Sequence, residues 1–401
     1  MSVPLDRLYH YLDDCVNHDL IIYGWTPYGS TKLEDLLPWK NYSQQQLSAC
    51  VPLICHDQEP LNFAQYSTYQ IKNFVMQYLT KNNLEKYCRN TILEYLSEQH
   101  LRSVTNFNNP HDLVILLHSE LNSSQLELFS RKGFVPVYYW SHALISQDWF
   151  RYAEHDPKLK FNVDNIKKDF LIYNRAWQGT REYRLYFTEK LLNNQLCNHC
   201  QITFNPQDQW HYTQHIFKNK NFQITNYTIE QYLAPTQATS TSSADYNNED
   251  YFNTGIEIVL ETLFDDTRWH LTEKSLRPIA CGKPFILAAT PGSLRYLQSY
   301  GFETFSGLID ESYDLVVEPH LRLQAIVKEM QRITQLSTIE KYKLYTDLDV
   351  ICQRNKQHFF NGFINQVVNE YKTNLDQAMQ IMHQNCTGKH FAEIKRLLKN
   401  N

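Results

Sequence analysis

The side chains best suited to chemistry are concentrated in residues 270–278, HLTEKSLRP. Thr272 is placed to cap the start of a helix, and the free N–H groups of such a helix favour an anionic ligand in front of it. An ionised carboxylate only accepts hydrogen bonds, so Glu273 suits ribose hydroxyls, while Lys274 offers the positive charge that a diphosphate leaving group requires. The spacing is equally compatible with a surface pair that caps a helix.

A second cluster is rich in arginine. Asn174 and Arg175 directly follow a predicted strand, and Arg181 and Arg184 lie at the start of the next predicted helix. Side chains just beyond the carboxyl end of a strand lie where open α/β sheets bind ligands. Because a guanidinium group matches phosphate oxygens bidentately, the cluster indicates a phosphate site. Ion pairs with glutamates of the same helix are the alternative interpretation.

Ionisable side chains also follow predicted strands of the first half. Asp57 and Glu59 follow one strand, residues 118–120 (HSE) end another, and His142 follows a further one. In a parallel sheet these strand ends meet at one edge. A carboxylate or an imidazole there could accept a proton from an incoming hydroxyl group. Each side chain alone is compatible with a helix cap, whereas together they indicate a site.

Metal binding is not expected. Cys197 and Cys200 with His211 and His215 imitate a zinc site, but the spacing between the pairs is short and a predicted strand separates them. Residues 347–349 form a DxD sequence, which in metal-dependent glycosyltransferases binds a cation, yet here it lies inside a segment of helical period. We therefore predict no metal site and no bound cofactor.

Glycine is scarce, with 11 residues in a chain of 401, against a usual share of about 7%. Neither GxGxxG nor GxxxxGK[ST] occurs, so a nucleotide would have to be held by side chains or by helix termini. Gly282 and Gly292 flank the predicted strand 284–287, where a close approach of the backbone to a ligand would need glycine. GxSxG and HExxH are also absent, which argues against the hydrolases that use them.

Composition and charge restrict the class of protein further. A hydrophobic share of 42% and a charged share of 20% are typical of a globular chain, and a net charge of −5 gives no basic field toward nucleic acid. No apolar run reaches the roughly 18–20 residues of a membrane-spanning helix, and residues 1–10 do not resemble a signal peptide. Scattered cysteines indicate reduced thiols. We expect a cytoplasmic protein, in the host-cell cytoplasm if a phage encodes it.

The first half alternates short apolar runs with segments of helical period. The predicted strands are 20–23, 52–55, 113–118 and 136–139. The predicted helices are 70–79, 90–98 and 123–132. This alternation predicts a parallel sheet covered on both faces, which is a Rossmann-like α/β domain.

The second half repeats the alternation. The predicted strands are 170–173, 201–204 and 284–287, and the predicted helices are 181–193, 255–262, 272–281, 293–300, 321–336, 339–356 and 359–382. The low-complexity residues 234–250 fit a tolerated surface insertion better than a mobile loop beside a cleft. We predict an N-terminal domain at 1–165, a second Rossmann-like domain at 166–372 and a helical tail at 373–401.

Residues 261–305, ETLFDDTRWHLTEKSLRPIACGKPFILAATPGSLRYLQSYGFETF, resemble the nucleotide-sugar-binding half of α-1,3-fucosyltransferase-like enzymes. In those enzymes an acidic residue, here Glu261, precedes a TEK helix and a G-x-P strand. The chain also resembles a group of phage and bacterial glycosyltransferase-like proteins with KPF, GF-x-TF and DESYD segments, the last at 310–314 here. That group shares an NR…R crossover, matched by Asn174, Arg175 and Arg184, and pieces similar to DQEP and YYW-x-HAL.

The resemblance implies a GT-B architecture, in which two Rossmann-like domains face each other across a cleft and helices end the chain. The second domain would bind a UDP- or GDP-linked sugar and the first an acceptor, without an essential metal. Glu273 would contact the donor ribose, Lys274 its phosphates and Arg184 the diphosphate, with Arg181 the second choice for that place. The whole predicted donor site consists of Asn174, Arg175, Arg181, Arg184, Glu261, Thr272, Glu273, Lys274 and Gly292.

The expected activity is transfer of a sugar to an acceptor hydroxyl, with inversion at the anomeric carbon. The catalytic-base motif of the fucosyltransferases has no clear match, so Glu59, Asp57 and His142 are all candidates for the base. The acceptor is a glycan or a hydroxymethylated DNA base. The alternative is a catalytically inactive GT-B-like module that binds a nucleotide-sugar or a glycan.

Overall fold

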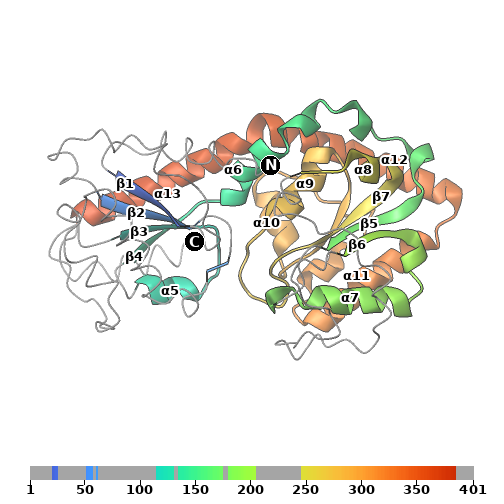
Figure 1. Ribbon diagram of the computed structural model, residues 1–401, viewed down its shortest axis with the longest axis horizontal. Helices are drawn as coiled ribbons and strands as arrows, with labels where there is room; N and C mark the ends of the chain where they lie inside the picture. Colours follow the sequence, from blue (N-terminus) through green and yellow to red (C-terminus); the bar gives the residue numbers. More distant parts are fainter. Residues whose placement is uncertain are drawn as a thin grey trace. The chain divides into compact units, whose positions relative to one another are not determined.

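The computed structural model describes residues 20–25, 51–56, 60–61, 114–130, 134–174, 179–204 and 245–384. The protein has an α/β fold with two parallel four-stranded sheets and a long C-terminal helix (Figure 1). The chain divides into two compact units, one made mainly of Ser146–Ile364 and the other of Pro4–Ile145 with Asn365–Asn401. No helix of the described residues is long and apolar enough to cross a bilayer.

The first sheet confirms the strands predicted in the first half. Its strands lie in the order β1 (Leu20–Trp25), β2 (Val51–His56), β3 (Val114–His118) and β4 (Phe134–Tyr138), all parallel. The described side chains of β3 and β4 are buried without alternation, as expected when both faces of a sheet are covered. The helices described with this sheet are α5 (Gln125–Ser130), α6 (Ser141–Trp149) and α13 (Ile364–Gln384). The predicted helices 70–79 and 90–98 lie outside the described residues.

The second sheet has the order β6-β5-β7-β8 and is also parallel. Its strands are β5 (Lys168–Asn174), β6 (Cys200–Phe204), β7 (Thr254–Leu260) and β8 (Phe285–Ala288). Its helices are α7 (Tyr183–Asn193), α8 (Asn248–Asn253), α9 (Glu273–Cys281), α10 (Ser293–Ser299), α11 (Pro319–Thr334) and α12 (Thr338–His358). Helices α8, α9 and α12 cover one face of this sheet, and α7 and α11 cover the other (Figure 1).

Short helical turns join these elements. The 3₁₀ turns are η4 (Arg151–Glu154), η5 (Pro157–Leu159), η6 (Val163–Asn165), η7 (Gly179–Arg181), η8 (Cys197–His199) and η13 (Glu311–Leu315). A π-helical turn, η14 (Phe359–Phe363), joins α12 to α13, so the predicted break near residue 357 is a local change of helical winding.

The helix predicted at 255–262 is wrong, because these residues form the central strand β7. Every residue of β7 is buried, and its β-branched side chains Ile256, Ile258 and Val259 suit a strand covered on both faces. Glycine is required at position 255, where a Cβ atom would lie 2.7 Å from a ring carbon of Tyr345. The segment is too short for periodicity alone to separate helix from buried strand.

A buried ion pair fixes α9 against β7. Arg277 donates to Glu257 at 2.5 Å and to the Tyr251 hydroxyl at 3.0 Å, and its guanidinium lies 4.5 Å from the ring centroid of Tyr173. Tyr251 also donates to Glu257. Breaking one side of such a buried pair is strongly destabilising, because it leaves a charge without compensation. The network therefore sets the rotation of α9 about its own axis.

The end of the low-complexity segment belongs to the same region. Asp250 lies in α8 and accepts hydrogen bonds from Tyr173 at 2.6 Å and from Gln201. Residues 248–250 are therefore part of the packed structure and not of a surface insertion. Residues 234–244 of the segment lie outside the described residues.

The DESYD segment protects the edge strand β8. The Tyr313 hydroxyl accepts the Leu287 N–H at 3.1 Å, and Glu311 accepts the Phe305 N–H at 2.7 Å. Asp310 caps η13, and Asp314 accepts the Leu294 N–H of α10 at 3.2 Å. Because an uncovered strand edge is a site for unwanted pairing, the segment has a structural role in this fold.

Lys283 is an isolated buried cation between α9 and β8. It is 4% exposed, and its ammonium lies 5.0 Å from the ring centroid of Phe161. No carboxylate forms an ion pair with it among the described residues. Burial lowers the pKa of Lys283 to about 8. The folded state therefore disfavours the protonated form of this side chain.

Lys283→Met should stabilise the protein at pH 7 by about 1–3 kcal/mol, because the folded wild type must bury a charge that the unfolded chain holds in water. The wild type should gain stability as the pH rises from about 8 toward the unfolded value near 10.4, and the variant should lack this gain. Urea unfolding at pH 7 and pH 9.5 measures both effects. As a control, Lys341→Met removes the 2.8 Å ion pair with Asp169 and should destabilise. A less stable Lys283→Met protein at pH 7 would contradict this account.

Candidate functional site

Most described residues of the predicted donor site lie at the carboxyl edge of the second sheet. Asn174 is the last residue of β5, Glu261 directly follows β7, and Gly292 lies between β8 and α10. Helices α7, α9 and α10 all begin at this edge, because each follows a strand of the parallel sheet. Ligands of open α/β sheets bind at this edge, and helix amino ends favour anions there.

Glu261 holds the start of α9. Its carboxylate accepts hydrogen bonds from the Thr272 N–H at 2.9 Å, the Thr272 hydroxyl at 2.7 Å, the Ser275 hydroxyl at 2.5 Å and the Thr262 N–H at 3.1 Å. The residue is 0% exposed. A carboxylate has about four acceptor positions, and these donors fill them. Glu261 therefore positions the helix, while direct contact of its side chain with a donor stays a prediction.

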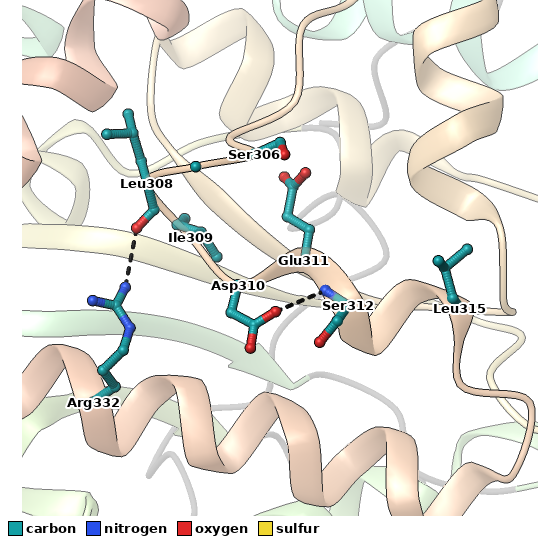
Figure 2. A pocket seen from close by; sticks show the side chains of 9 residues that line it. Ser306, Leu308, Ile309, Asp310, Glu311, Ser312, Leu315 and Arg332 are labelled. Atoms are coloured by element: carbon teal, nitrogen blue, oxygen red, sulfur yellow. Dashed lines mark hydrogen bonds between the residues drawn. The ribbon is translucent and has the colours of Figure 1, made fainter.

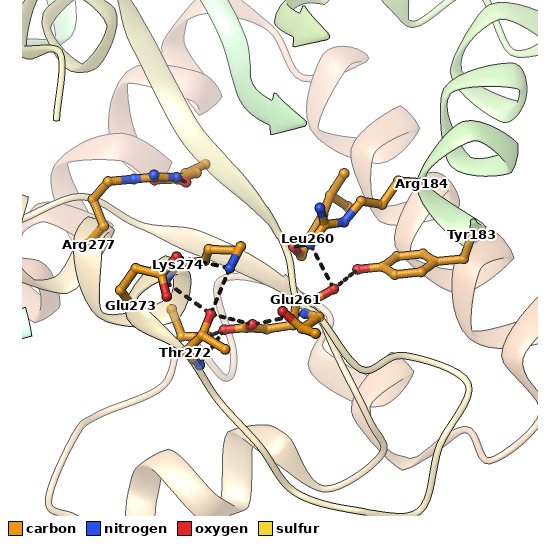
Figure 3. Close-up of polar contacts among 11 residues, drawn as sticks. Tyr183, Arg184, Leu260, Glu261, Thr272, Glu273, Lys274 and Arg277 are labelled. Atoms are coloured by element: carbon orange, nitrogen blue, oxygen red, sulfur yellow. Dashed lines mark hydrogen bonds and ion pairs between the residues drawn. The ribbon is translucent and has the colours of Figure 1, made fainter. Parts of the chain in front are cut away.

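The TEK residues form the first turn of α9, as predicted. Thr272 is the N-cap, and its hydroxyl accepts the Lys274 N–H. The Lys274 ammonium lies 2.9 Å from the Glu273 carboxylate and 3.1 Å from the Thr272 hydroxyl. Figure 3 shows these groups together beside Glu261. An ammonium has three donors, so one Lys274 donor is available to a ligand, and the side chain is 22% exposed.

Arg184 braces the end of β7 from the first turn of α7. Its guanidinium donates to the Leu260 carbonyl at 2.7 Å and to the Glu261 carbonyl at 3.1 Å. The neighbouring Tyr183 hydroxyl donates to the same Glu261 carbonyl at 2.6 Å (Figure 3). Burial lowers the pKa of Arg184. Contact of Arg184 with a diphosphate stays a prediction. The same holds for contact of the half-buried Arg181 with a diphosphate. Arg175 lies outside the described residues.

Asn174 is buried and has no hydrogen-bond partner among the described residues. It is 1% exposed, and neither its side-chain nitrogen nor its oxygen meets a partner in that part of the chain. Alternation along β5 places Tyr173 on the face covered by α8 and α9, so Asn174 belongs to the face covered by α7. Such a group costs about 1–3 kcal/mol in a folded protein unless something satisfies it. It therefore marks a position where a polar ligand group would bind favourably.

The start of α10 already holds an internal anion. Asp314 accepts the Leu294 N–H at 3.2 Å, and its carbonyl oxygen accepts the Gly292 N–H at 2.8 Å. Burial raises the pKa of Asp314 to about 6, although backbone donors of α10 oppose the shift. Gly292 has a φ of +82°, and a Cβ atom there would lie 3.2 Å from the Trp269 ring. Glycine at this position serves the turn into α10.

Helix α7 continues directly from the 3₁₀ turn η7. Its N-cap residue Glu182 has helical dihedral angles and makes no side-chain capping hydrogen bond of its own. The amino end of a helix favours an anion. Asn174 and Lys274 lie at the same edge of the sheet. The edge between β5 and the starts of α7 and α9 is therefore our candidate site.

The first sheet brings two of its predicted clusters, those at His118 and His142, to one edge. His118 ends β3, and His142 lies in the first turn of α6, which follows β4. Glu120, also buried, accepts the N–H of Leu61, just past the DQEP segment. The described residues thus support the predicted convergence of strand ends. Asp57 and Glu59 lie outside the described residues.

One surface cavity of about 550 Å³ lies away from the predicted donor residues (Figure 2). Residues 306–312 line it together with Leu315 and Arg332. Its polar groups serve the fold, since Arg332 donates to the Leu308 carbonyl at 3.0 Å and Asp310 accepts the Ser312 N–H at 3.1 Å. Burial raises the pKa of Glu311 here. None of the predicted site residues lines this cavity.

Two further residues contact this region of the sheet edge. Tyr183 lies between two arginines in the sequence, at a helix start beside a strand end, which is a detectable signal. Arg322 lies in a long helical segment without a motif, so its sequence context carries no such signal. No group of metal-ligating side chains occurs in the part of the chain that the structure describes, and His211 and His215 lie outside that part.

Comparison of the sequence with known protein families gave no match, and comparison with curated proteins gave no significant match.

Glu261→Gln should destabilise the protein by about 2–4 kcal/mol. The amide N–H₂ group of glutamine would face donors whose hydrogen bonds the carboxylate accepts in the wild type. Equilibrium urea unfolding measures the change. Glu303→Gln is the matched control, since Glu303 is half-exposed and pairs with Arg354 on the surface, and its loss should be under about 1 kcal/mol. Equal changes in the two variants would show that Glu261 does not hold α9.

Proposed function

We propose that the protein is a glycosyltransferase that moves a sugar from a UDP- or GDP-linked donor to an acceptor hydroxyl. The donor would bind at the carboxyl edge of the second sheet, and the GT-B arrangement that the sequence resemblance implies is part of the proposal. The acceptor would be a glycan or a hydroxymethylated DNA base. The net charge of −5 favours the glycan, because duplex DNA binding normally depends on several contacts from lysine or arginine to phosphate.

The buried Asn174 amide is the observation that carries this proposal. Both of its polar atoms lack partners within the described part of the chain, and it ends β5 directly before the crossover to α7. An amide offers a donor and an acceptor together, which suits ribose or sugar hydroxyls. The amino end of α7 and the ammonium of Lys274 suit the negative charge of a diphosphate.

The chemistry would be a single displacement. A base of the first half takes the proton from the acceptor hydroxyl, and the resulting oxygen forms a bond to the anomeric carbon of the donor. The bond from that carbon to the diphosphate breaks at the same time, and the electron pair leaves with the diphosphate. Lys274 and the start of α7 stabilise the departing charge. Asp57, Glu59 and His142 are the candidates for the base.

Asn174→Leu should separate ligand binding from stability. Removal of the unsatisfied amide should stabilise the ligand-free protein by about 1–2 kcal/mol, whereas the rise in melting temperature caused by the donor should disappear. The measurement is a thermal-shift titration with UDP-, GDP-, ADP- and CMP-sugars, because a ligand that binds only the native state raises Tm. If none of these nucleotide-sugars raises the Tm of the wild type, the proposed function is contradicted.

Asn355→Leu is the matched control for that experiment. Asn355 is equally buried, but its side chain accepts the Glu303 N–H at 2.8 Å and donates to the Glu303 carbonyl at 2.8 Å. This variant should lose stability and keep the rise in Tm caused by the donor. If Asn174→Leu also keeps that rise in Tm, Asn174 does not contact the donor.

Lys274→Ala should lower the rate of transfer at least about 100-fold, which corresponds to roughly 2.7 kcal/mol of lost charge stabilisation. Its unfolding curve should stay close to that of the wild type. Release of UDP or GDP in the presence of glycan or hydroxymethylated DNA acceptors measures turnover. Lys328→Ala, which removes an exposed lysine of α11, is the control and should remain active.

The alternative function is a non-enzymatic module that binds a nucleotide-sugar or a glycan. A wild-type protein that shows a donor-induced shift in Tm but no turnover with either acceptor class would favour this alternative. Full activity of Lys274→Ala would instead remove Lys274 from the mechanism.

A further inference from the structure

Arg322 is the most deeply buried arginine of α11 and contacts backbone instead of carboxylates. Its guanidinium donates to the Val316 carbonyl at 2.6 Å, the Val317 carbonyl at 3.0 Å and the Phe264 carbonyl at 2.5 Å. The residue is 1% exposed, and its Nε atom has no partner among the residues that the structure describes. It therefore ties the start of α11 to the loop that follows β7.

No carboxylate of the described residues lies within ion-pair distance of Arg322. The charged groups that influence it from neighbouring elements are Asp265, Asp314 and Glu318, and burial still lowers the pKa of Arg322 to about 10. Carbonyl oxygens accept its hydrogen bonds but do not cancel its charge. A buried charge without a counter-ion is costly, so the positive charge remains available to a nearby anion.

A stack of planar groups connects Arg322 to the candidate site. The guanidinium lies 4.1 Å from the ring centroid of Phe264, and the Phe264 ring stacks on Tyr183 with centroids 4.4 Å apart. Tyr183 is the first residue of α7, and its hydroxyl donates to the Glu261 carbonyl. The rings of Phe264 and Tyr183 thus connect Arg322 to the start of α7.

We propose that Arg322 is a positioning residue of the donor site, which holds the loop after β7 and supplies a buried positive charge that selects diphosphate-bearing ligands over uncharged ones. This inference rests on the proposed function and extends it to the chemical class of the ligand. The charge acts across low-polarity aromatic groups, where water screens it less than at the surface. A nucleoside carries no phosphate, so its affinity should not depend on the charge of Arg322.

Arg322→Gln tests the proposal, because glutamine keeps an N–H₂ group for the backbone carbonyls and removes the charge. The measurement compares, by isothermal titration, the affinity for UDP and GDP with the affinity for uridine and guanosine. The variant should lose on the order of tenfold in diphosphate affinity and less than twofold in nucleoside affinity. Arg322→Lys keeps the charge and should preserve the wild-type ratio of the two affinities, even where its Tm falls.

Arg332→Met is the matched control, since Arg332 lies in the same helix, is 45% exposed and pairs with Glu329. It should leave the affinity ratio unchanged. Equal losses of diphosphate and nucleoside binding in Arg322→Gln, or no loss of either, would overturn the proposal. If the wild type binds neither UDP nor GDP, the proposed function itself fails, which is a distinct outcome. Where Arg322→Gln does not fold, a shifted ratio in Arg322→Lys overturns the charge argument.

Discussion

The second half of the fold depends on the backbone and side chain of one residue, Glu261, at the end of the central strand β7. Its carboxylate accepts the donors at the start of α9, and its carbonyl oxygen accepts those of Tyr183 and Arg184 at the start of α7. Two helices from opposite faces of the sheet are therefore tied to the same point. Because both ends are buried, small displacements at Glu261 would move both helix starts together.

The helix starts at this edge differ in how their positive ends are compensated. The start of α9 is compensated by Glu261 and Thr272, and that of α10 by Asp314. The N-cap residue of α7 makes no side-chain capping hydrogen bond of its own, and Asn174 at the end of β5 has no partner among the described residues. A buried polar group without a partner is uncommon in folded proteins. The proposed donor site therefore includes the end of β5 as well as the TEK turn.

Some of the motifs that suggest a family serve the fold. The DESYD segment covers the edge of β8 and caps α10, and Arg184 braces the carbonyls at the end of β7. Because these contacts belong to the packed structure, the motifs are compatible with both an enzyme and a binding module. The proposed activity depends on Asn174 and Lys274.

Local sequence pattern was sufficient to predict most of the strands of this protein and the start of α9. Apolar runs identified seven of the strands, and the Thr272 cap was evident from its place before a helical segment. These features depend on neighbours in sequence, which a pattern records. Sequence could not identify β7 as a strand, because a short buried run has no decisive period and the charge of Glu257 is compensated only in the tertiary structure, by Arg277. Only tertiary structure decided that Asn174 has no partner among the described residues and that aromatic rings connect Arg322 to α7, because both facts depend on contacts between residues far apart in the chain.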